Sequence, residues 1–319
     1  MNSILITGID GFVGSYLNDL VHQQYPEFSI HGTFLHHMPS FSTPTFGHKC
    51  DLLNRSEVME LVKKIKPKKI FHLAGIAYVP DAEDNPVISL EINGIGSFNL
   101  FDAVEQYVPD ARVITVSSSN VYGKQYFNQN LTESVPIEPH NIYGLSKALM
   151  EQFASYFYRE KKLSIIVMRA FNHIGPRQSD KFVLSNFAKQ IAEIERKQKP
   201  PKIYVGDLSV VRDFTDVRDI VYGYYLAMEK GQSGDVYNIC FGKGYDIQSL
   251  LEKLIEFSSL KIEICQDPHR LRKSEIPYLV GAHDKLRAST GWTPQYDILD
   301  TLKDILGYWR DVVLRNPLE

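Results

Sequence analysis

Residues 4–14, ILITGIDGFVG, constrain the fold more than any other part of the chain. An apolar run leads into Gly8, Gly11 and Gly14, and apolar residues at helical spacing follow. Glycines in this arrangement permit a tight turn, let the backbone approach a phosphate group, and let a helix pack closely on a sheet. The free N–H groups and the dipole at the start of that helix favour an anion. The pattern predicts a strand, a dinucleotide-binding turn and a helix.

Apolar runs alternate with helical periodicity through the first half of the chain. We expect strands near residues 28–35, 69–74, 112–117 and 163–169, while the Ser, Thr and Pro of residues 39–48 predict a surface loop. Such alternation favours a parallel sheet with helices on both faces. The predicted fold class is α/β, a Rossmann doubly wound parallel sheet with a smaller α/β substrate domain.

After Asn172 the alternation changes, and no clean linker separates two parts of the chain. We therefore expect two domains that interleave in sequence. Residues 1–171 and 211–240 are predicted to form the NAD(P)-binding Rossmann domain, and residues 172–210 and 241–319 the substrate-binding domain.

Composition excludes several classes of partner. The chain has 319 residues and a net charge of −3, which allows a large buried core and gives no basic surface for nucleic acid or an anionic membrane. The three cysteines show no ligand spacing, so we expect buried thiols in a reducing compartment and no metal site. The N-terminus enters a core strand without a basic leader, and no apolar run could span a bilayer. We expect a cytoplasmic protein.

The end of the second predicted strand bears on the choice of cofactor. Turns that select NAD usually carry an acid about twenty residues further on, which binds the ribose. Residues 31–37 read HGTFLHH, with no carboxylate. An acid there would repel a 2′-phosphate, so its absence permits NADP(H) without requiring it, and His36 and His37 could help to hold a phosphate. NADP(H) is favoured, and NAD(H) stays possible.

Tyr143 and Lys147 lie four residues apart, so on a helix they share one face. A neighbouring ammonium lowers the pKa of a tyrosine and suits it to act as an acid. Tyr158 and Lys162 have the same spacing, but they fall at the far end of the same predicted helix. A serine run, residues 117–119, closes a predicted strand at its carboxyl end, where doubly wound sheets bind ligands.

The motifs TGIDGFVG, HLAG, SSSNVYG and YGLSK, in this order, resemble the extended short-chain dehydrogenase/reductases that act on nucleotide sugars. In the second half, FNHIGPRQS, VRDFTDVRD, DVYNIC and TGWTP resemble the branch of that family that reduces GDP-4-keto-6-deoxy sugars. The resemblance covers essentially the whole chain. It implies an NAD(P)-dependent enzyme that transfers hydride to the C4 keto group of a GDP-4-keto-6-deoxyhexose, giving a GDP-6-deoxyhexose such as GDP-D-rhamnose.

The resemblance also implies roles for individual residues. Tyr143 would donate the proton, and Lys147 would bind the nicotinamide ribose and tune Tyr143. Ser118, which matches the family's position four residues before Tyr122, would hydrogen-bond the reacting oxygen. The implied cofactor contacts are Gly8, Gly11, Phe12, Val13, Gly14, Asp51, Leu52, Leu73, Ala74, Gly75, Tyr143, Lys147 and His173. The implied substrate contacts are Ser118, Asn172, Val183, Arg212, Arg272 and Glu275.

Other activities on the same scaffold are an epimerase or a 4,6-dehydratase, and a non-enzymatic alternative is an idle dinucleotide-binding sensor or scaffold. The intact set of Ser118, Tyr143 and Lys147 argues against the idle protein. Related dehydratases use an acid two residues before Tyr122 to take a proton from C5 of the sugar. Here that residue is Asn120, whose amide has no basic site, although some reductases of the family keep an acid there.

Many relatives are homodimers, and the resemblance implies the same for this chain. The contact would be a four-helix bundle built from the predicted helices 88–108 and 143–159. Both helices carry enough apolar surface, but their periodicity does not separate an interface from ordinary core packing.

Overall fold

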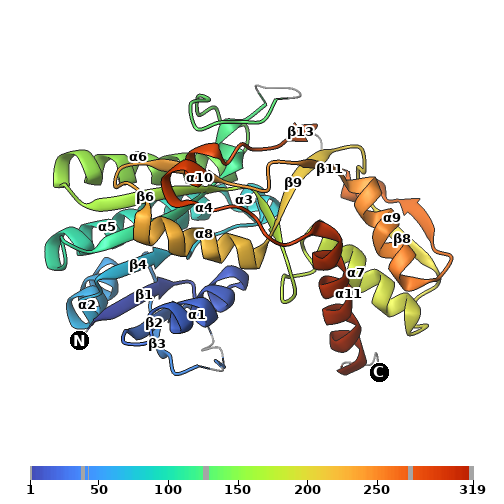
Figure 1. Cartoon of the computed structure of the whole chain (residues 1–319), viewed down its shortest axis with the longest axis horizontal. Coiled ribbons are helices and arrows are strands. Elements are labelled where there is room, and N and C mark those ends of the chain that lie inside the picture. Colours follow the sequence, from blue (N-terminus) through green and yellow to red (C-terminus); the bar gives the residue numbers. More distant parts are fainter. Residues whose placement is uncertain (1, 37–39, 42, 125–128, 272–275, 316–319) are drawn as a thin grey trace.

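Seven parallel strands form the central sheet of the computed structural model, which describes residues 2–36, 40–41, 43–124, 129–271 and 276–315. Their order across the sheet is β10-β6-β5-β4-β1-β2-β3 (Figure 1). The strands are β1 (Ser3–Thr7), β2 (Ser29–Phe34), β3 (Phe46–Lys49), β4 (Lys69–His72), β5 (Arg112–Ser118), β6 (Ser164–Ala170) and β10 (Val236–Ile239). Every residue of β1 is buried, as expected for a strand covered on both faces. The predicted α/β fold with a doubly wound parallel sheet is confirmed.

Helices cover both faces of this sheet, and the pleat of β1 assigns its side chains to two cores. Ile4 and Ile6 pack with α1 (Phe12–Gln24) and α8 (Val217–Lys230). Leu5, which points to the other face, packs in the core of the remaining sheet helices. Those helices are α2 (Arg55–Ile65), α5 (Gly96–Tyr107) and α6 (Ile142–Lys161). Short helical segments connect them: α3 (Val79–Asp84), α4 (Pro86–Leu90), the π-helical turn η1 (Glu91–Ile95) and the 3₁₀ turn η2 (Ser119–Tyr122).

A smaller lobe has its own apolar core and lies at the right of Figure 1. One sheet joins β7 (Asn172–Ile174), β9 (Val211–Asp216), β11 (Gly244–Asp246) and β13 (Tyr278–Leu279), and a second pairs β8 (Lys202–Val205) with β12 (Glu263–Gln266). The helices of this lobe are α7 (Val183–Glu195), α9 (Ile247–Ser258) and α11 (Ile298–Arg315). The short turn η3 (Pro268–Arg270) follows β12.

The buried carboxylate of Asp213, on β9, fastens the two lobes together. It accepts the backbone N–H groups of Phe241 and Gly242, each at 2.8 Å, and that of Gly281 at 3.3 Å. Phe241 and Gly242 follow β10 of the large sheet, whereas Gly281 follows β13 of the smaller one. Burial raises the pKa of Asp213 to about 7, and the three N–H groups oppose that rise. Both oxygens accept hydrogen bonds, which is the arrangement that suits the ionised form.

The chain crosses between the lobes several times. Strand β9 pairs only with strands of the smaller lobe, while α8 and β10 pack in the larger one. Leu286, on α10 (Asp284–Thr290), and Trp292 then return to the core beside Tyr224 of α8. The boundaries given above from the sequence stay a prediction. We propose that residues 211–216 belong to the smaller lobe and residues 284–292 to the larger.

Two further features bear on the predicted partners. No helix within the described ranges is long and apolar enough to cross a membrane. Across the same residues, no group of three or more His, Cys, Asp or Glu side chains is placed to hold a metal ion.

Candidate active site

The carboxyl ends of β1, β4 and β5 meet at one edge of the large sheet. Their register places Thr7 beside His72, and His72 beside Thr115. The strand order reverses between β1 and β4, since later strands are added on opposite sides of this pair. Ligands of doubly wound sheets bind in the crevice above such a reversal. The predicted glycine turn and the predicted Ser118 both lie at this edge.

The glycine turn has the close packing that its sequence predicts. Gly8 has a φ of +69°, and a Cβ there would come within 2.8 Å of the Cα of Ala74. A Cβ on Gly14 would collide with the carbonyl oxygen of Gly8. Helix α1 begins at Phe12, after an N-cap, Gly11, that supplies no side-chain hydrogen bond, and its first turn holds no acidic residue. An uncapped helix N-terminus without acids fits the pyrophosphate of a dinucleotide.

A chain of buried hydrogen bonds, absent from the sequence-based prediction, runs behind the turn. The Thr7 hydroxyl accepts the N–H groups of Leu73 and Ala74, each at 3.2 Å, and lies 2.7 Å from Nδ1 of His72. The other ring nitrogen, Nε2, lies 2.8 Å from the hydroxyl of Ser97. Burial lowers the pKa of His72 to about 3, so the ring is neutral. These hydrogen bonds between uncharged groups therefore hold the loop after β4 in place.

Asn93, in the π-helical turn η1, is a second residue that the sequence analysis missed. Its Oδ1 accepts the N–H of Ile76 at 2.9 Å, and its Nδ2 donates to the carbonyl of Ile76 at 3.1 Å and to Ser146 Oγ at 2.8 Å. Asn93 therefore ties the loop that holds Gly75 to helix α6. A Cβ on Gly75, where φ is +156°, would lie 3.5 Å from Nζ of Lys147. Single π-turns inside helices often mark functional sites, but this turn is evident only in the structure and not in the sequence.

The structure brings Ser118, Tyr143 and Lys147 together. Ser118 ends β5, while Tyr143 and Lys147 lie one turn apart on α6, and all three are buried. Tyr143 lies close enough to Ser118 for that hydroxyl to lower the pKa of the phenol, an effect that favours the tyrosinate. Burial has the larger effect and raises the pKa of Tyr143. The phenol is therefore protonated at neutral pH and can donate.

Lys147 lies deep enough for its charge to be costly. Its Nζ donates to the carbonyl oxygen of Val116 at 2.9 Å. Burial lowers the pKa of Lys147 to about 8, although the Glu151 carboxylate opposes that effect. With a pKa this low, the Lys147 side chain can gain or lose its proton near physiological pH.

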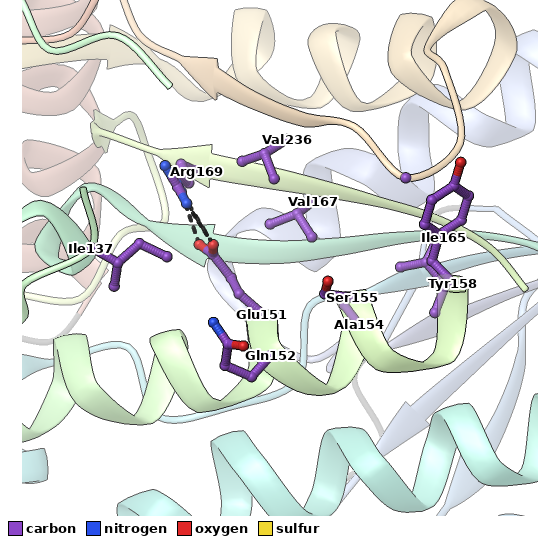
Figure 2. A pocket seen from close by; sticks show the side chains of 11 residues that line it. Ile137, Glu151, Gln152, Ala154, Ser155, Tyr158, Ile165, Val167, Arg169 and Val236 are labelled. Atoms are coloured by element: carbon purple, nitrogen blue, oxygen red, sulfur yellow. Dashed lines mark hydrogen bonds and ion pairs between the residues drawn. The ribbon is translucent and has the colours of Figure 1, made fainter. Parts of the chain in front are cut away.

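Glu151, one turn after Lys147, forms a buried ion pair with Arg169 of β6 (Figure 2). Arg169 Nη2 lies 2.7 Å from Glu151 Oε2, and the hydroxyl of Ser117 donates to Oε1 at 2.5 Å. The Arg169 guanidinium also donates to Tyr122 Oη at 3.0 Å. The pair borders a cavity of about 200 Å³ beside α6. Neither Ser118 nor Tyr143 lines that cavity, so it is separate from the candidate site.

The second Tyr-x-x-x-Lys pair lies far from the site. Tyr158 is 38% exposed and lines the cavity beside α6. Lys162 is the C-cap of α6, and its Nζ donates to the carbonyl of Arg159 at 2.6 Å. Of the two pairs, it is Tyr143 and Lys147 that lie near the carboxyl end of β5.

The residues predicted to hold the substrate come from the smaller lobe and its edge. Asn172 and His173 lie on β7, which pairs with β9, the strand of Arg212. The His173 ring stacks parallel to Phe12 at 6.1 Å between centroids, and it contacts the carbonyl of Phe171 through Nδ1 at 3.0 Å. Val183 opens α7. The predicted contacts Arg272 and Glu275 lie outside the described residues.

At the predicted adenine end, Asp51 is exposed, and its Oδ1 accepts the N–H of Leu53 at 3.0 Å. Leu52 is buried, and its carbonyl accepts from Asn99 at 2.8 Å. Strand β2 ends at Phe34 and is followed by exposed Leu35 and His36, neither of which carries a carboxylate. His37 lies outside the described residues.

A turn built for a dinucleotide, next to a buried tyrosine and lysine at the same sheet edge, defines a short-chain dehydrogenase/reductase. The chain belongs to the GDP-mannose 4,6 dehydratase family, whose model matches residues 5–305. It is 34% identical to the GDP-6-deoxy-D-mannose reductase of Pseudomonas aeruginosa over 97% of this chain and 98% of the relative. It is 32% identical to the GDP-6-deoxy-D-talose 4-dehydrogenase of Aggregatibacter actinomycetemcomitans over 89% of each chain.

Solved structures agree with these sequence matches. The Pseudomonas aeruginosa RMD structure, complexed with NADPH, superposes with a TM-score of 0.87 at 32% identity, covering 98% of this chain and all of the other. The UDP-glucose 4-epimerase of Thermotoga maritima with UDP-glucose gives a TM-score of 0.89 at 25% identity, covering 98% of this chain and 99% of the other. The predicted membership of the nucleotide-sugar short-chain dehydrogenase/reductases is confirmed.

Proposed function

We propose that this protein reduces the C4 keto group of a GDP-4-keto-6-deoxyhexose, giving a GDP-6-deoxyhexose such as GDP-D-rhamnose. One observation carries the proposal: Ser118, Tyr143 and Lys147 lie buried together at the carboxyl end of β5. The identity of 34% to a GDP-6-deoxy-D-mannose reductase, along nearly the whole chain, supports the choice of sugar.

A nicotinamide held at this edge would supply a hydride to the C4 carbon and would itself be oxidised. As that bond forms, the electron pair of the carbonyl moves onto its oxygen. Tyr143, which burial keeps protonated, gives its proton to that oxygen, and Ser118 donates a hydrogen bond to it. Two preorganised donors around a developing alkoxide stabilise the transition state. The Tyr143 oxygen then regains a proton from solvent.

Lys147 contributes through its position. Its ammonium lies one helical turn from Tyr143 and next to Gly75, where the nicotinamide ribose is proposed to bind. A positive charge there favours the developing tyrosinate, which makes the proton transfer easier.

We assign the nucleotide half of the substrate to the edge of the smaller lobe. Arg212 lies on β9. Its guanidinium is close enough to His140, in the loop before α6, for its positive charge to act on that ring. A guanidinium pairs with phosphate oxygens through two parallel N–H groups, so Arg212 suits the diphosphate. Arg272 and Glu275 are proposed for the same nucleotide by resemblance alone.

NADPH is the proposed cofactor. The end of β2 presents no carboxylate to repel a 2′-phosphate, and the RMD structure from Pseudomonas aeruginosa contains NADPH. Other neighbours of the same fold hold NAD, so NAD(H) stays the second choice.

We also propose a homodimer in the cytoplasm, formed through α5 and α6. Support comes from apolar side chains exposed along one stripe of α6 and on the segment before α5. Leu145 is 45% exposed and Tyr156 is 43% exposed, and they lie at helical spacing on one face. Ile95, the last residue of η1, adds a further exposed apolar group just before α5. A second copy would cover this surface.

The proposed activity is tested with purified protein, GDP-4-keto-6-deoxymannose and NADPH, and the product is identified by NMR. We expect NADPH oxidation and one GDP-6-deoxyhexose with a C4 hydroxyl. GDP-mannose with NADP⁺ should give no keto sugar, because Asn120 replaces the acid that elimination needs. Keto sugar from that second reaction would identify a dehydratase instead. Absence of NADPH oxidation in the first would contradict the proposal.

A further inference from the structure

Ser118 is joined to the start of α6 by a series of hydrogen bonds, here called the amide relay (Gly144, Asn141, Asn120 and Ser118). The backbone N–H of Gly144 donates to Asn141 Oδ1 at 2.7 Å. Asn141 Nδ2 donates to Asn120 Oδ1 at 3.2 Å. Asn120 then donates twice to Ser118 Oγ, from Nδ2 and from its backbone N–H, each at 3.2 Å.

The direction of the amide relay is set by a group that cannot reverse. The two ends of a carboxamide have the same shape, so its partners decide which end is oxygen. The Gly144 N–H is only a donor, and it faces the Asn141 oxygen. Asn141 must then present its NH₂ group to Asn120, so the oxygen of Asn120 faces Asn141. The NH₂ group of Asn120 is left to face Ser118.

This direction determines what Ser118 can do. A hydroxyl group has two lone pairs and one hydrogen. Both lone pairs of Ser118 Oγ accept from Asn120, so its hydrogen must point elsewhere. The side that remains faces Tyr143, whose phenol lies close enough to Ser118 for the hydroxyl to affect its pKa. Ser118 is therefore held as a donor aimed at the place where the reacting oxygen binds.

Backbone packing keeps the amide relay together. Asn141 is the N-cap of α6, two residues before Tyr143. A Cβ on Gly144 would come within 2.5 Å of the carbonyl oxygen of Asn120, so only glycine lets the first turn of α6 approach η2 this closely. The helix that carries Tyr143 and the turn that follows Ser118 therefore form one unit.

We propose that Asn120 is a positioning residue that, with Asn141, holds the Ser118 hydroxyl as a hydrogen-bond donor to the reacting oxygen. The inference rests on the proposed function, since it concerns the donors of that reaction. A carboxylate at residue 120 would accept from Ser118 and turn its hydrogen away. In this chain the amide of Asn120 therefore sets the direction of the Ser118 hydroxyl.

A first experiment compares Asn120→Asp with Asn120→Ala at neutral pH. Aspartate has the size of asparagine but reverses the Ser118 hydroxyl, whereas alanine leaves it free to rotate. We expect kcat to fall by on the order of 10²-fold for Asn120→Asp, the cost of losing one oxyanion donor. The loss for Asn120→Ala should be clearly smaller. Equal losses, or a greater loss for alanine, would contradict the inference.

A charge introduced near the reacting oxygen could itself lower the rate, and a remote variant separates this effect. Asn141→Asp keeps an acceptor for the Gly144 N–H, so α6 stays capped and the melting temperature should not fall. Its second oxygen can only accept, which turns the Asn120 amide round and reverses Ser118. We expect kcat to fall about tenfold or more. In the Ser118→Ala background the same change should cost less than about twofold. Equal losses in both backgrounds would overturn the inference.

Failure of the proposed function would appear in the wild-type protein alone, as no turnover of the GDP-4-keto sugar. The amide relay is then judged from melting temperatures, which need no substrate. Asn120→Ala and Ser118→Ala should each lower the melting temperature, and the double variant should lose clearly less than the sum. Additive losses would show that the two side chains do not act together, and would overturn the inference.

Discussion

At the scale of single residues, burial controls the chemistry of the site. Tyr143 and Lys147 are both withdrawn from water, and burial acts on them in opposite senses. It raises the pKa of Tyr143, which keeps the phenol protonated, and it lowers the pKa of Lys147 to about 8, which weakens the ammonium. Exposed tyrosine and lysine have similar pKa values, so burial moves the two apart: the phenol keeps its proton more firmly, and Lys147 gives its proton up more readily.

Tyr143→Phe should remove the proton donor and leave nucleotide-sugar affinity near that of the wild type. The expected loss in kcat is on the order of 10²–10⁴-fold, the range for a positioned acid. Tyr158→Phe is the matched control, because Tyr158 has the same spacing to a lysine on the same helix but lies outside the site. Steady-state kinetics with NADPH measure both. Normal turnover in Tyr143→Phe would remove it from the proposed role.

Lys147→Met should stabilise the cofactor-free protein at neutral pH. Folding lowers the pKa of Lys147 from 10.5 to about 8, so the folded state binds the proton more weakly than the unfolded state. The charged lysine therefore destabilises the fold below pH 8, and the cost disappears as the pH rises from 8 to 10.5. The unfolding free energy should rise by on the order of 2 kcal/mol. This figure already allows for the lost hydrogen bond to the Val116 carbonyl. Denaturant unfolding at pH 7 and pH 10 tests this, and a variant that is less stable at pH 7 would contradict it.

The spacing of residues in sequence predicted which side chains would meet, but not how they are held. The helical repeat predicted Tyr143 and Lys147, and the strand end predicted the serine run 117–119, from which the family resemblance selected Ser118. Asn93 and His72 could not be found this way, because their partners are backbone groups and side chains distant in the chain. Such contacts carry no local periodicity.

At the scale of secondary-structure elements, the strongly apolar strands were the most predictable. Strand β3 (Phe46–Lys49) was missed, since residues 39–48 were expected to form a surface loop. The reason is its place at the sheet edge, beside β2 alone, where none of its residues is buried. An edge strand needs no apolar run, so its sequence does not distinguish it from a loop.

Asp213 is the side chain through which β9 holds both lobes, and its substitution tests that joint. Asp213→Asn leaves one oxygen for three N–H donors, so its NH₂ group must face at least one of them. A buried donor without a partner costs about 1–3 kcal/mol. Asp207→Asn, at an exposed carboxylate that accepts from Ser209, should change the stability by less than about 0.5 kcal/mol. Urea unfolding measures the stability of both variants. Equal stabilities would show that the Asp213 carboxylate does not hold the two lobes together.

At the scale of the whole molecule, the proposed cofactor site lies on the large sheet, and the smaller lobe lies at the right of that sheet in Figure 1. The glycine turn and the alternation of strands and helices predicted the large sheet. They could not predict the path of the chain between lobes, because each crossing depends on contacts such as that of Trp292 with the larger core. The motifs of the first half indicated the family, which the comparisons then confirmed, and those of the second half indicated its GDP-sugar branch.

The proposed dimer can be tested by measuring the molecular mass of the protein in solution. Tyr156→Arg places a charge in the exposed apolar stripe of α6, and the dimer should dissociate at micromolar concentration. Tyr222→Arg is the control, since Tyr222 is 40% exposed on α8, which covers the other face of the sheet. Light scattering should give a dimer for the wild type and for Tyr222→Arg, and a monomer for Tyr156→Arg. A monomeric wild type would contradict the proposal.

The central claim is that hydride passes from NADPH to C4 of a GDP-4-keto-6-deoxy sugar. Transfer of deuterium from C4-deuterated NADPH tests it most directly, with each of the two labelled diastereomers used in turn and the product examined by NMR. One diastereomer should place deuterium at C4 of the GDP-6-deoxyhexose, and the other should leave C4 unlabelled. In Tyr143→Phe, the rate at which deuterated product forms should fall by the same factor as kcat. A product without deuterium at C4 from either diastereomer, or no product at all, would contradict the account.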